Sequence, residues 1–578
     1  CLGPSTASIT NAATERGIPW IRLNEGNLVQ IGYGSRQRRI WTAESDQTSA
    51  IAESISSDKD LTKHLLAACG VPVPEGRIVE STEDAWAAAE DIGLPVVVKP
   101  RDGNHGRGVS INLTTRQEVE DAYGIADKEG SAVMVERFVP GDEHRLLVVG
   151  NRVVAAAKGE TAWIVGDGSA SVAELIDRQI NSDPRRGPDD NFPLGFVLLE
   201  EDTAVVLELK RQGYTPESVP GAGKKVLIQR NGNVTLDVTD LVHPDVDAVV
   251  ALAARVVGLD IAGIDVVAED ISRPLEEQRG AIVEVNAGPG LHMHLMPAEG
   301  EPRPVGRAIV DNLFPVGEDG RIPIVGVAGT QDTSLIARLV AWLIHLWGRS
   351  VGLACRDGLF LDLRQVEKKD CANWAAGQRL LINRTLEAAV FENGAELILG
   401  QGLAYDRCQV GIVTDVEGAA ALGQYDIQDA EQMFHVLRTQ VDVVSPGGAA
   451  VLNAADPVVM RMAVLCDGEA ILYGLSSNLP AIVEHRAQGH RALFLRDKRI
   501  MLAQGPVEGL LAELPAYAAP KEENKNTVPR AAGLLAAAGA AVALGIPVEI
   551  IRVGIETFER DRNGITPQPS HVRKTAIQ

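Results

Sequence analysis

The chain contains 578 residues, of which 45% are apolar, 23% charged and 4% aromatic, and its formal net charge is −23. At roughly 150 residues per domain, this length predicts three or four domains. A chain this acidic is poorly suited to neutralising nucleic-acid phosphates, so we expect no nucleic-acid partner. The longest uncharged apolar stretch, residues 531–546, is too short and too weakly apolar to span a bilayer, so we expect no membrane partner.

The six cysteines are scattered along the chain without a CxxC pair. This pattern indicates a reducing compartment, here the cytoplasm, and argues against a disulfide framework or a structural zinc site. The sequence has no signal peptide. It begins with Cys1 rather than methionine, which predicts a fragment or a processed form of a longer protein. A large cytosolic enzyme is the simplest interpretation.

A strand and two hairpins are predicted in the first half of the chain. Residues 92–100 are an apolar run that ends in lysine and proline, as is typical of a strand. Residues 146–157 are two apolar runs broken at Gly150-Asn151, and residues 226–238 repeat this pattern around Asn231-Gly232. Such dipeptides between apolar runs favour tight turns, so we expect two β-hairpins.

A helix and two further strands are predicted next. Residues 246–257 have helical periodicity, with Pro244 near the start and Gly258 as a stop signal. Apolar runs at residues 261–267 and 281–285 predict two strands.

The second half has the pattern of a separate domain. A polar link at residues 317–321 precedes a new apolar strand at residues 322–327. Strand and helix patterns then alternate, as in a doubly wound parallel sheet. We therefore predict an α/β multidomain protein with three parts, namely residues 1–315, residues 322–560 and a polar tail at residues 561–578.

Three oxygen-bearing side chains are predicted to meet on neighbouring strands. Glu284 and Asn286 are two residues apart, so both project from one face of their strand. Asp265 lies on the preceding strand and brings a second carboxylate towards them. Buried carboxylates need a counter-charge, and Mg²⁺ that bridges to nucleotide phosphates supplies one. The alternative is that these acids only cap strand ends at the surface.

A lysine and a glycine-rich turn favour phosphate binding. Lys99 ends a strand, and the turn after it contains Gly106 and Gly108, which permit close backbone approach to phosphates. Residues 135–139 follow as an apolar strand with acceptor groups suited to an adenine edge. Arg145 then stands where it can face a phosphate.

The order of these residues resembles that of ATP-grasp ligases, and several individual segments are similar to those of the cyanophycin synthetase family. The resemblance covers nearly all of residues 1–314, although the family's extra N-terminal domain is absent. The segments that carry it are Asp58-Lys59, Asn104-His105-Gly106-Arg107-Gly108, Asp183-Pro184-Arg185-Arg186-Gly187, Gly263-Ile264-Asp265 and Glu284-Val285-Asn286-Ala287.

The resemblance implies a reaction in which ATP phosphorylates the main-chain carboxylate at the C-terminus of a growing polymer, and an incoming amine displaces the phosphate. It also implies a role for each matching residue. Lys59 and Lys99 would hold phosphates, Glu136, Phe138 and Val139 the adenine, Arg145 the acyl phosphate, Asp265, Glu284 and Asn286 the magnesium, and Arg185, Arg186 and His294 the substrate. For Arg185 and Arg186, a solvated basic turn is an equally good interpretation.

Two stretches depart from the family pattern. Residues 157–163 replace a Glu-Arg-Val-Pro-Ala-His pattern, and His292 replaces an arginine before Met293-His294. Both stretches are expected to touch the amine substrate, so substrate choice is altered on this interpretation. His292 and His294 could alternatively form a metal pair, but no further soft ligand accompanies them.

Residues 322–560 resemble the central domain of Mur ligases, the second catalytic module of the same family. That module opens with a Gly-Thr-Asn-Gly-Lys-Thr-Thr loop, whereas this chain has Thr333 at the lysine position and Asp332 in place of a glycine. A carboxylate in a phosphate loop repels its ligand. The other altered positions are residues 392–396, residues 417–421 and His435 or Leu437, whereas residues 453–457 stay close to the adenine-site pattern.

These losses predict an inactive second site. One working site would stall if it added aspartate alone, so we expect the family's truncated second type, which polymerises β-aspartyl-arginine dipeptides with ATP and Mg²⁺. The alternatives are a bifunctional enzyme that adds aspartate and arginine separately, and a non-catalytic polymer-binding partner. A homo-oligomer, dimer or tetramer, is expected, and the acidic surface would attract a polymer dense in guanidinium groups.

Overall fold

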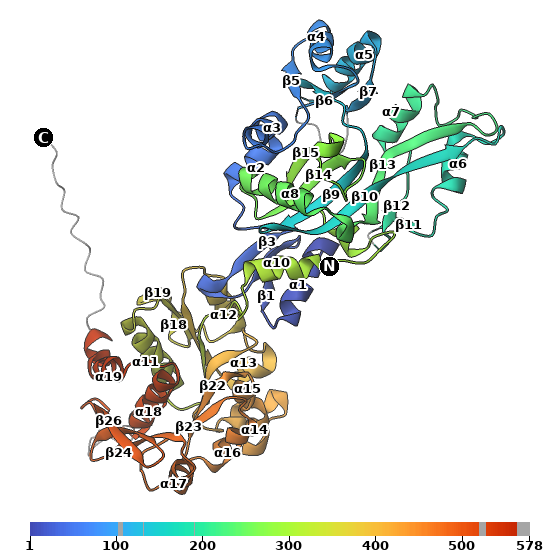
Figure 1. Cartoon of the computed structure of the whole chain (residues 1–578). Helices are drawn as coiled ribbons and strands as arrows, with labels where there is room; N and C mark the ends of the chain where they lie inside the picture. Colours follow the sequence, from blue (N-terminus) through green and yellow to red (C-terminus); the bar gives the residue numbers. More distant parts are fainter. Residues whose placement is uncertain (102–107, 131, 190, 201, 519–527, 563–578) are drawn as a thin grey trace, which may run out of the picture. The chain divides into compact units, whose positions relative to one another are not determined.

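The structure is a computed structural model in which residues 1–578 are described except for 102–107, 131, 190, 201, 519–527 and 563–578. The chain divides into two compact units (Figure 1). Unit 1 consists of Cys1–Ile31 and Arg38–Asp319, and unit 2 of Gly32–Gln37 and Gly320–Gln578. The short segment Gly32–Gln37 therefore belongs to unit 2, although it lies inside the sequence of unit 1.

Unit 1 is built around a five-stranded sheet in the order β13-β10-β9-β14-β15. A second, four-stranded sheet in the order β5-β8-β6-β7 is covered by α4 (Thr82–Ile92) and α5 (Arg116–Ala126). The strands of these sheets are β5 (Gly76–Val79), β6 (Val96–Pro100), β7 (Ser110–Leu113), β8 (Val133–Arg137), β9 (Asp142–Val149), β10 (Arg152–Val165), β13 (Lys225–Asp237), β14 (Ile261–Ala268) and β15 (Ala281–Ala287).

The rest of unit 1 supports these two sheets. The remaining strands are β1 (Trp20–Arg22), β2 (Leu28–Ile31), β3 (Arg38–Trp41), β4 (Glu44–Ser45), β11 (Arg186–Gly187) and β12 (Leu194–Gly195). The remaining helices are α1 (Pro4–Glu15), α2 (Ala50–Ser57), α3 (Lys59–Ala68), α6 (Val172–Gln179), α7 (Thr203–Arg211), α8 (Pro244–Val257), α9 (His292–Leu295) and α10 (Val305–Leu313).

One of the two predicted hairpins is confirmed and the other is wrong. Strands β9 and β10 turn at Gly150, whose φ of +64° is the left-handed conformation that glycine adopts without strain. Residues 226–238 form no hairpin, because β13 runs unbroken through Asn231-Gly232 and pairs with β10 instead. The long β10 offers backbone partners along this length, with register shifts between Lys158 and Trp163, so no turn is needed at Asn231-Gly232.

The predicted helix of unit 1 is confirmed as α8. Pro244 is its first residue, and Gly258 ends it in the left-handed conformation with φ +90°. Its apolar face, which includes Val250 and Ala254, packs in the core beneath β9 and β14. The helix thereby fixes the central strands from which the candidate site is built.

Unit 2 is a doubly wound α/β unit. Its eleven-stranded sheet has the order β19-β18-β17-β20-β16-β21-β22-β23-β24-β25-β26, and the strands from β17 to β24 in this order pair in parallel. The strands are β16 (Ile324–Ala328), β17 (Val351–Cys355), β18 (Gly358–Leu361), β19 (Arg364–Glu367), β20 (Ala388–Asn393), β21 (Cys408–Val413), β22 (Val444–Asn453), β23 (Glu469–Gly474), β24 (Arg491–Arg496), β25 (Arg499–Gln504) and β26 (Val507–Glu513).

Helices cover both faces of this sheet (Figure 1). Val451 of β22 packs into the core under α11 (Thr333–Leu346), α18 (Val528–Ala543) and α19 (Val548–Arg562), whereas its neighbours Ala450 and Leu452 pack into a separate core. The other helices are α12 (Trp374–Leu381), α13 (Ala395–Gly400), α14 (Ala430–Leu437), α15 (Thr439–Asp442), α16 (Pro457–Met460) and α17 (Pro480–Ala487). Within the described part of the chain, none of the helices combines the length and apolar character needed to cross a membrane.

Candidate active site

The centre of the candidate site is a row of three side chains on adjacent strands of unit 1. Arg145 on β9 lies opposite Asp265 on β14, and Asp265 lies opposite Glu284 on β15. Arg145 Nη2 donates a hydrogen bond to Asp265 Oδ2 at 2.7 Å. The antiparallel register thus brings together two of the predicted metal ligands and the predicted acyl-phosphate residue, which are far apart in the sequence.

The row concentrates negative charge in a buried place. Asp265 is only 3% exposed, and burial raises its pKa well above the ordinary value, with Glu143 and Glu284 adding to the rise and Arg145 opposing it. Burial also raises the pKa of Glu143, which lies two residues before Arg145 on β9. Of these carboxylates, Asp265 and Glu284 lie opposite each other on adjacent strands, and such a pair favours binding of a cation.

Asn286 completes the predicted ligand set. It lies two residues beyond Glu284 on β15, on the same face, and opposite Gly263 of β14. A Cβ at Gly263 would come within 2.9 Å of Pro289, so a residue with a side chain would clash with Pro289 at this position. Asp265 Oδ1 is buried and accepts no hydrogen bond, although Arg145 lies against it.

This donor set fits Mg²⁺, because carboxylate and amide oxygens are its preferred protein ligands and Asp265 Oδ1 is a buried oxygen that accepts no hydrogen bond. Among the described residues, no group of three or more histidine, cysteine, aspartate or glutamate side chains is arranged to hold a metal. The set identified here has only two such members, and Mg²⁺ is normally completed by water and phosphate oxygens.

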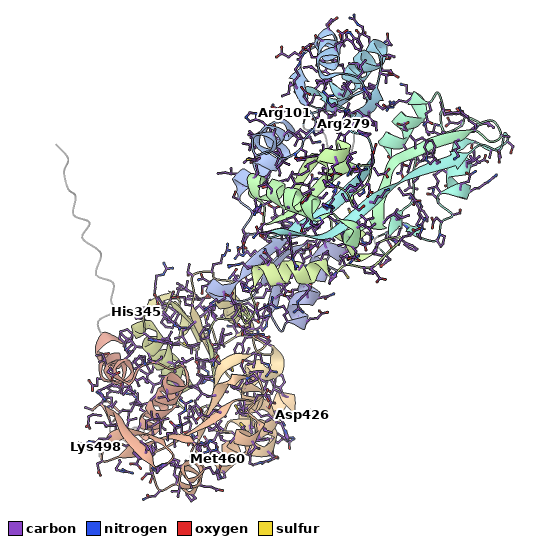
Figure 2. The ribbon with its side chains drawn as sticks, in the orientation of Figure 1. Arg101, Arg279, His345, Asp426, Met460 and Lys498 are labelled. Carbon is purple, nitrogen blue, oxygen red and sulfur yellow. The ribbon has the colours of Figure 1, made fainter. Side chains whose placement is uncertain are left out.

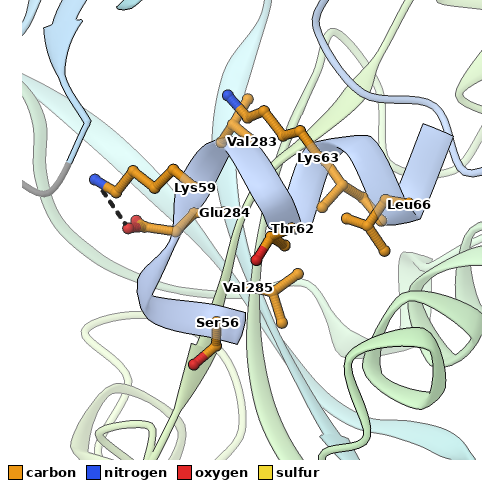
Figure 3. Close-up of a pocket in the computed structure, with 9 residues that line it drawn as sticks. Ser56, Lys59, Thr62, Lys63, Leu66, Val283, Glu284 and Val285 are labelled. Atoms are coloured by element: carbon orange, nitrogen blue, oxygen red, sulfur yellow. Dashed lines mark ion pairs between the residues drawn. The ribbon is translucent and has the colours of Figure 1, made fainter. Parts of the chain in front are cut away.

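Helix α3 brings two lysines to the edge of this row. Asp58 caps the helix by accepting a hydrogen bond from the Leu61 amide, and Arg101, labelled in Figure 2, contacts the same carboxylate. Lys59 Nζ lies 3.2 Å from Glu284 Oε1 (Figure 3). Burial acts to raise the pKa of Glu284, but Lys59, together with Lys99 and Arg145, lowers the pKa overall.

A small pocket lies between α3 and β15 beside this ion pair. Figure 3 shows Lys59 and Lys63 extending from the same helix above strand β15. The residues that line the pocket are Ser56, Lys59, Thr62, Lys63, Leu66, Ile282, Val283, Glu284 and Val285.

Lys63 and Lys99 share the carboxylate of Glu136. Lys99 Nζ lies 2.8 Å from Glu136 Oε2, and Lys63 contacts Oε1 of the same group. All three side chains are buried. Burial acts to raise the pKa of Glu136, but the two ammonium groups outweigh it and lower the pKa, so the carboxylate stays ionised. Burial, with Lys99 adding to it, lowers the pKa of Lys63 to about 7, so the cluster has one net positive charge only when both lysines are protonated. It lies where the sequence predicted a phosphate-binding lysine.

The rest of the predicted nucleotide segment is partly described. Gly106 lies outside the described residues, whereas Gly108 has φ +71° and packs against Glu129. Phe138 and Val139 follow β8 and are half-buried, and the Phe138 amide donates to the Pro95 carbonyl at 3.1 Å. These residues therefore continue the strand that positions Glu136.

The predicted substrate residues lie in a different part of unit 1. Arg185 pairs with Asp183 at 2.7 Å and with Glu299 at 3.1 Å. Arg186 is buried and donates to the Gly195 carbonyl at 2.6 Å, so it is not part of a solvated turn. The guanidinium of Arg186 therefore has a structural partner in the β11–β12 sheet.

Among the predicted substrate residues, His294 is the one whose pKa is affected by Arg145 of the row. It is buried, its Nδ1 has no hydrogen-bond partner, and burial, with a smaller effect of Arg145, lowers its pKa to about 4. His292 contacts the Phe192 carbonyl through Nε2 at 2.9 Å. The two rings thus have different surroundings.

The strand–loop–helix turn of unit 2 carries the altered phosphate loop. It connects β16 to α11 through residues 329–332, and Asp332 adopts the left-handed conformation with φ +52°. Thr333 and Ser334, which open the helix, both donate hydrogen bonds to Glu392, at 2.7 and 2.8 Å. Thr333, whose hydroxyl is bonded to Glu392, stands at the position of the phosphate-loop lysine.

The other positions at which unit 2 departs from the Mur-ligase pattern lie in a turn and on helix α14. Residues 419–421 form a short 3₁₀ turn, His435 is exposed on α14 and Leu437 is buried in the core. Asn453 donates to the Thr414 carbonyl at 2.9 Å, and Asp456 caps α16.

Comparisons with known proteins identify the relatives of the chain. The family model of the carbamoyl-phosphate synthase L chain ATP-binding domain matches residues 58–167. The cyanophycin synthetase of Synechocystis sp. is 38% identical over 565 residues, which cover 96% of this chain and 64% of that protein. This chain is a homologue of the cyanophycin synthetases. It spans 62–65% of the length of the five cyanophycin synthetases with which it was compared.

Two further relatives of this cyanophycin synthetase homologue are glutathione-forming proteins. The glutathione biosynthesis bifunctional protein of Clostridium perfringens is 31% identical over 323 residues, 54% of this chain and 41% of that one. The crystal structure of a bifunctional glutathione synthetase from Pasteurella multocida is 29% identical with a TM-score of 0.39, covering 54% of this chain and 44% of that one. The family match places an ATP-grasp domain in unit 1, as predicted.

Sequence reasoning missed two site residues of this homologue, Lys63 and Glu143. Lys63 lies four residues after Lys59 on a helix, and this spacing puts both on one face. Glu143 lies two residues before Arg145 on a strand, which also puts both on one face. Both spacings can be seen in the sequence. The sequence does not show that Glu136 is the partner of Lys63.

Proposed function

We propose that this chain is an ATP-dependent, ADP-forming peptide ligase that polymerises β-aspartyl-arginine dipeptides into cyanophycin. The γ-phosphoryl group of ATP passes to the C-terminal carboxylate of the polymer, giving ADP and an acyl phosphate. The amine of the dipeptide then attacks the acyl carbon and releases inorganic phosphate. The observation that carries the proposal is the row Arg145–Asp265–Glu284, since it joins a partly exposed guanidinium to two carboxylates.

The residues divide the work by charge. Lys59 and Lys99 exchange their carboxylate partners for phosphate oxygens when ATP enters. Arg145 stabilises the charge on the transferring phosphoryl group, which is the main demand of such a reaction. Asp265, Glu284 and Asn286 would hold Mg²⁺, which supplies neutralisation of the phosphate charge.

The adenine and the polymer have their own segments. Glu136, Phe138 and Val139 border the adenine, with Glu136 kept in place by Lys63. Arg185, Arg186 and His294 belong to the segments that face the polymer and the incoming dipeptide.

The site of unit 2 takes no part in this chemistry. Thr333 offers a hydroxyl where a phosphate loop needs an ammonium group, and that hydroxyl is already bonded to Glu392. An enzyme with a single working site adds a preformed dipeptide without needing a second ligation step. We also propose a cytoplasmic homo-oligomer.

The deciding experiment supplies purified protein with primer, ATP and Mg²⁺, and with either the dipeptide or free aspartate plus arginine. Polymer growth is expected only from the dipeptide. Growth from the free amino acids would establish a bifunctional enzyme, and absence of dipeptide-dependent ATP turnover would establish a non-catalytic polymer-binding protein.

Two matched substitutions assign the activity to a unit. Asp265→Asn is expected to abolish polymer growth, whereas Thr333→Ala is expected to leave the rate unchanged. A comparable loss of polymer growth in Thr333→Ala would show that unit 2 takes part in the reaction.

A further inference from the structure

The turn between β16 and α11 in unit 2 has the architecture of an anion site. The turn leads directly into the N-terminus of a 14-residue helix, and strand–loop–helix turns of this kind commonly bind phosphates through their backbone N–H groups. The amides of Thr330 and Gln331 both donate to Oδ2 of Asp415, each at 3.0 Å. A carboxylate of the same chain therefore occupies these donors.

Asp415 has more partners than an ordinary structural carboxylate. The Thr330 hydroxyl donates to its Oδ1 at 2.8 Å, the Thr414 hydroxyl to its Oδ2 at 2.6 Å, and the Glu417 amide to its Oδ1 at 3.1 Å. The residue is 2% exposed. Burial acts to raise its pKa, but the hydrogen bonds from Thr414, Thr330 and Gln331 lower the pKa overall, so the group is a bound anion.

The surrounding turn is shaped around this carboxylate. Gly329 has φ +121°, and a Cβ there would lie 2.0 Å from the Thr414 hydroxyl and 3.0 Å from Asp415 Oδ2. Close backbone approach at this glycine is what lets the loop amides reach Asp415. A second internal carboxylate, Glu392, accepts from the Thr333 and Ser334 hydroxyls and from the Arg356 amide at 2.8 Å.

We propose that the β16–α11 turn is an oxyanion site whose anion is Asp415 of the same chain, which fills the place that a phosphate group would take. Unit 2 consequently holds its turn in a closed form without nucleotide, and it binds neither ATP nor inorganic phosphate while Asp415 is present. Removing this side chain opens a site for a phosphate-class anion. The inference concerns unit 2 alone and does not depend on the ligase activity of unit 1.

The test is rescue of Asp415→Ala by inorganic phosphate in the full chain. Hydrogen exchange of the amides in residues 329–333 is expected to accelerate about tenfold or more, the effect of losing one charge-assisted hydrogen bond. Inorganic phosphate at roughly ten times its dissociation constant should restore about tenfold of that protection, with chloride at equal ionic strength as the reference. The wild-type chain should show no phosphate effect at these amides.

Two further variants make the test specific. Asp415→Asn fills the same volume without the charge, so its exchange should accelerate while phosphate gives no rescue. If Asp415→Ala is not recovered folded, Asp415→Ser leaves similar room and should show the rescue. Asp467→Ala removes a carboxylate of the same unit that is 56% exposed and pairs with Arg407 at 3.2 Å, and it should change neither measurement.

Unchanged protection in Asp415→Ala would overturn the proposal, because the carboxylate would then not hold the turn. Faster exchange that phosphate does not reverse would also overturn it, since Asp415 would be an ordinary structural hydrogen-bond acceptor. Phosphate protection of the wild-type turn would overturn it as well, because the site would be open. Each outcome is independent of polymer synthesis, so failure here is distinguishable from failure of the proposed function.

Discussion

Arg145 and Asp265 form a hydrogen-bonded ion pair across the β9–β14 ladder, with Nη2 and Oδ2 2.7 Å apart. The aspartate is almost fully buried, whereas 24% of the arginine side chain is exposed. The guanidinium therefore neutralises a buried carboxylate and keeps part of its surface accessible to a ligand. On the proposed function, this dual position makes Arg145 the residue that couples the proposed metal ligands to the transferring phosphoryl group.

Arg145→Ala is expected to lower kcat for dipeptide-dependent ADP release by about 10²–10³-fold, because it removes stabilisation of the transferring group. Arg145→Lys should recover only part of this loss, since an ammonium cannot reproduce the guanidinium fork. The control is Arg116→Ala, which breaks an exposed pair with Glu120 on α5. Circular dichroism establishes that each variant is folded, and an unchanged kcat in folded Arg145→Ala would contradict the assignment.

His294 predicts a loss of stability in acid. Its pKa is about 4 in the folded chain, mainly because of burial, against an ordinary 6.5. Between these values the unfolded chain binds more protons, so the free energy of unfolding falls as pH falls from 6.5 towards 4. The contribution between pH 7 and pH 5 is about 2 kcal/mol, at about 1.4 kcal/mol per unit.

Urea unfolding of unit 1 at pH 7 and pH 5 measures this dependence. His294→Gln should show a difference between the two pH values that is smaller by about that 2 kcal/mol, whatever its stability at pH 7. His64→Gln, at an exposed position on α3, should keep the wild-type difference. An unaltered pH dependence in His294→Gln would mean that this histidine is not buried in its neutral form.

The grouping of the three proposed metal ligands could be predicted from the sequence because it depends on local periodicity. Glu284 and Asn286 share a face of any strand that contains them, and Asp265 lies on the strand before. The exact pairing of Asp265 with both Arg145 and Glu284 required the sheet order, which periodicity does not supply. The resemblance to ATP-grasp ligases named these residues but gave no distances.

The unpredicted features come from contacts between distant segments. Glu136 of β8 is shared by Lys63 of α3 and Lys99 of β6, and nothing local to residue 63 indicates this contact. The hairpin expected at Asn231-Gly232 failed because the neighbouring β10 is long enough to pair with the whole of β13. In both cases the structure depends on contacts with distant segments, which the local sequence pattern does not reveal.

The shared carboxylate of Glu136 predicts different effects for its two lysines. Lys99→Met should weaken binding of an ATP analogue by at least about tenfold, because it removes a phosphate ligand. Lys63→Met should mainly lower stability, by about 3 kcal/mol, since it leaves a buried carboxylate with a single partner. Lys128→Met, at an exposed position, is the control for loss of one positive charge.

Calorimetric titration with the analogue and urea unfolding separate these two effects. When ATP draws Lys99 towards its phosphates, Lys63 keeps Glu136 paired, so Lys63→Met is also expected to weaken analogue binding by a smaller factor. Equal binding losses in the two variants would make Lys63 a direct phosphate ligand instead.

The close approach of the loop at Gly329 predicts that unit 2 tolerates no side chain there. In Gly329→Ala the new methyl group would meet the Thr414 hydroxyl, and the positive φ adds strain, so the free energy of unfolding should fall by about 2–5 kcal/mol. Gly423→Ala is the matched control in the same unit, because its Cβ would have no heavy atom within 4 Å. Urea unfolding followed by hydrogen exchange of residues 324–346 measures both variants. Equal stability of Gly329→Ala and Gly423→Ala would show that the turn can move away from Thr414 without cost.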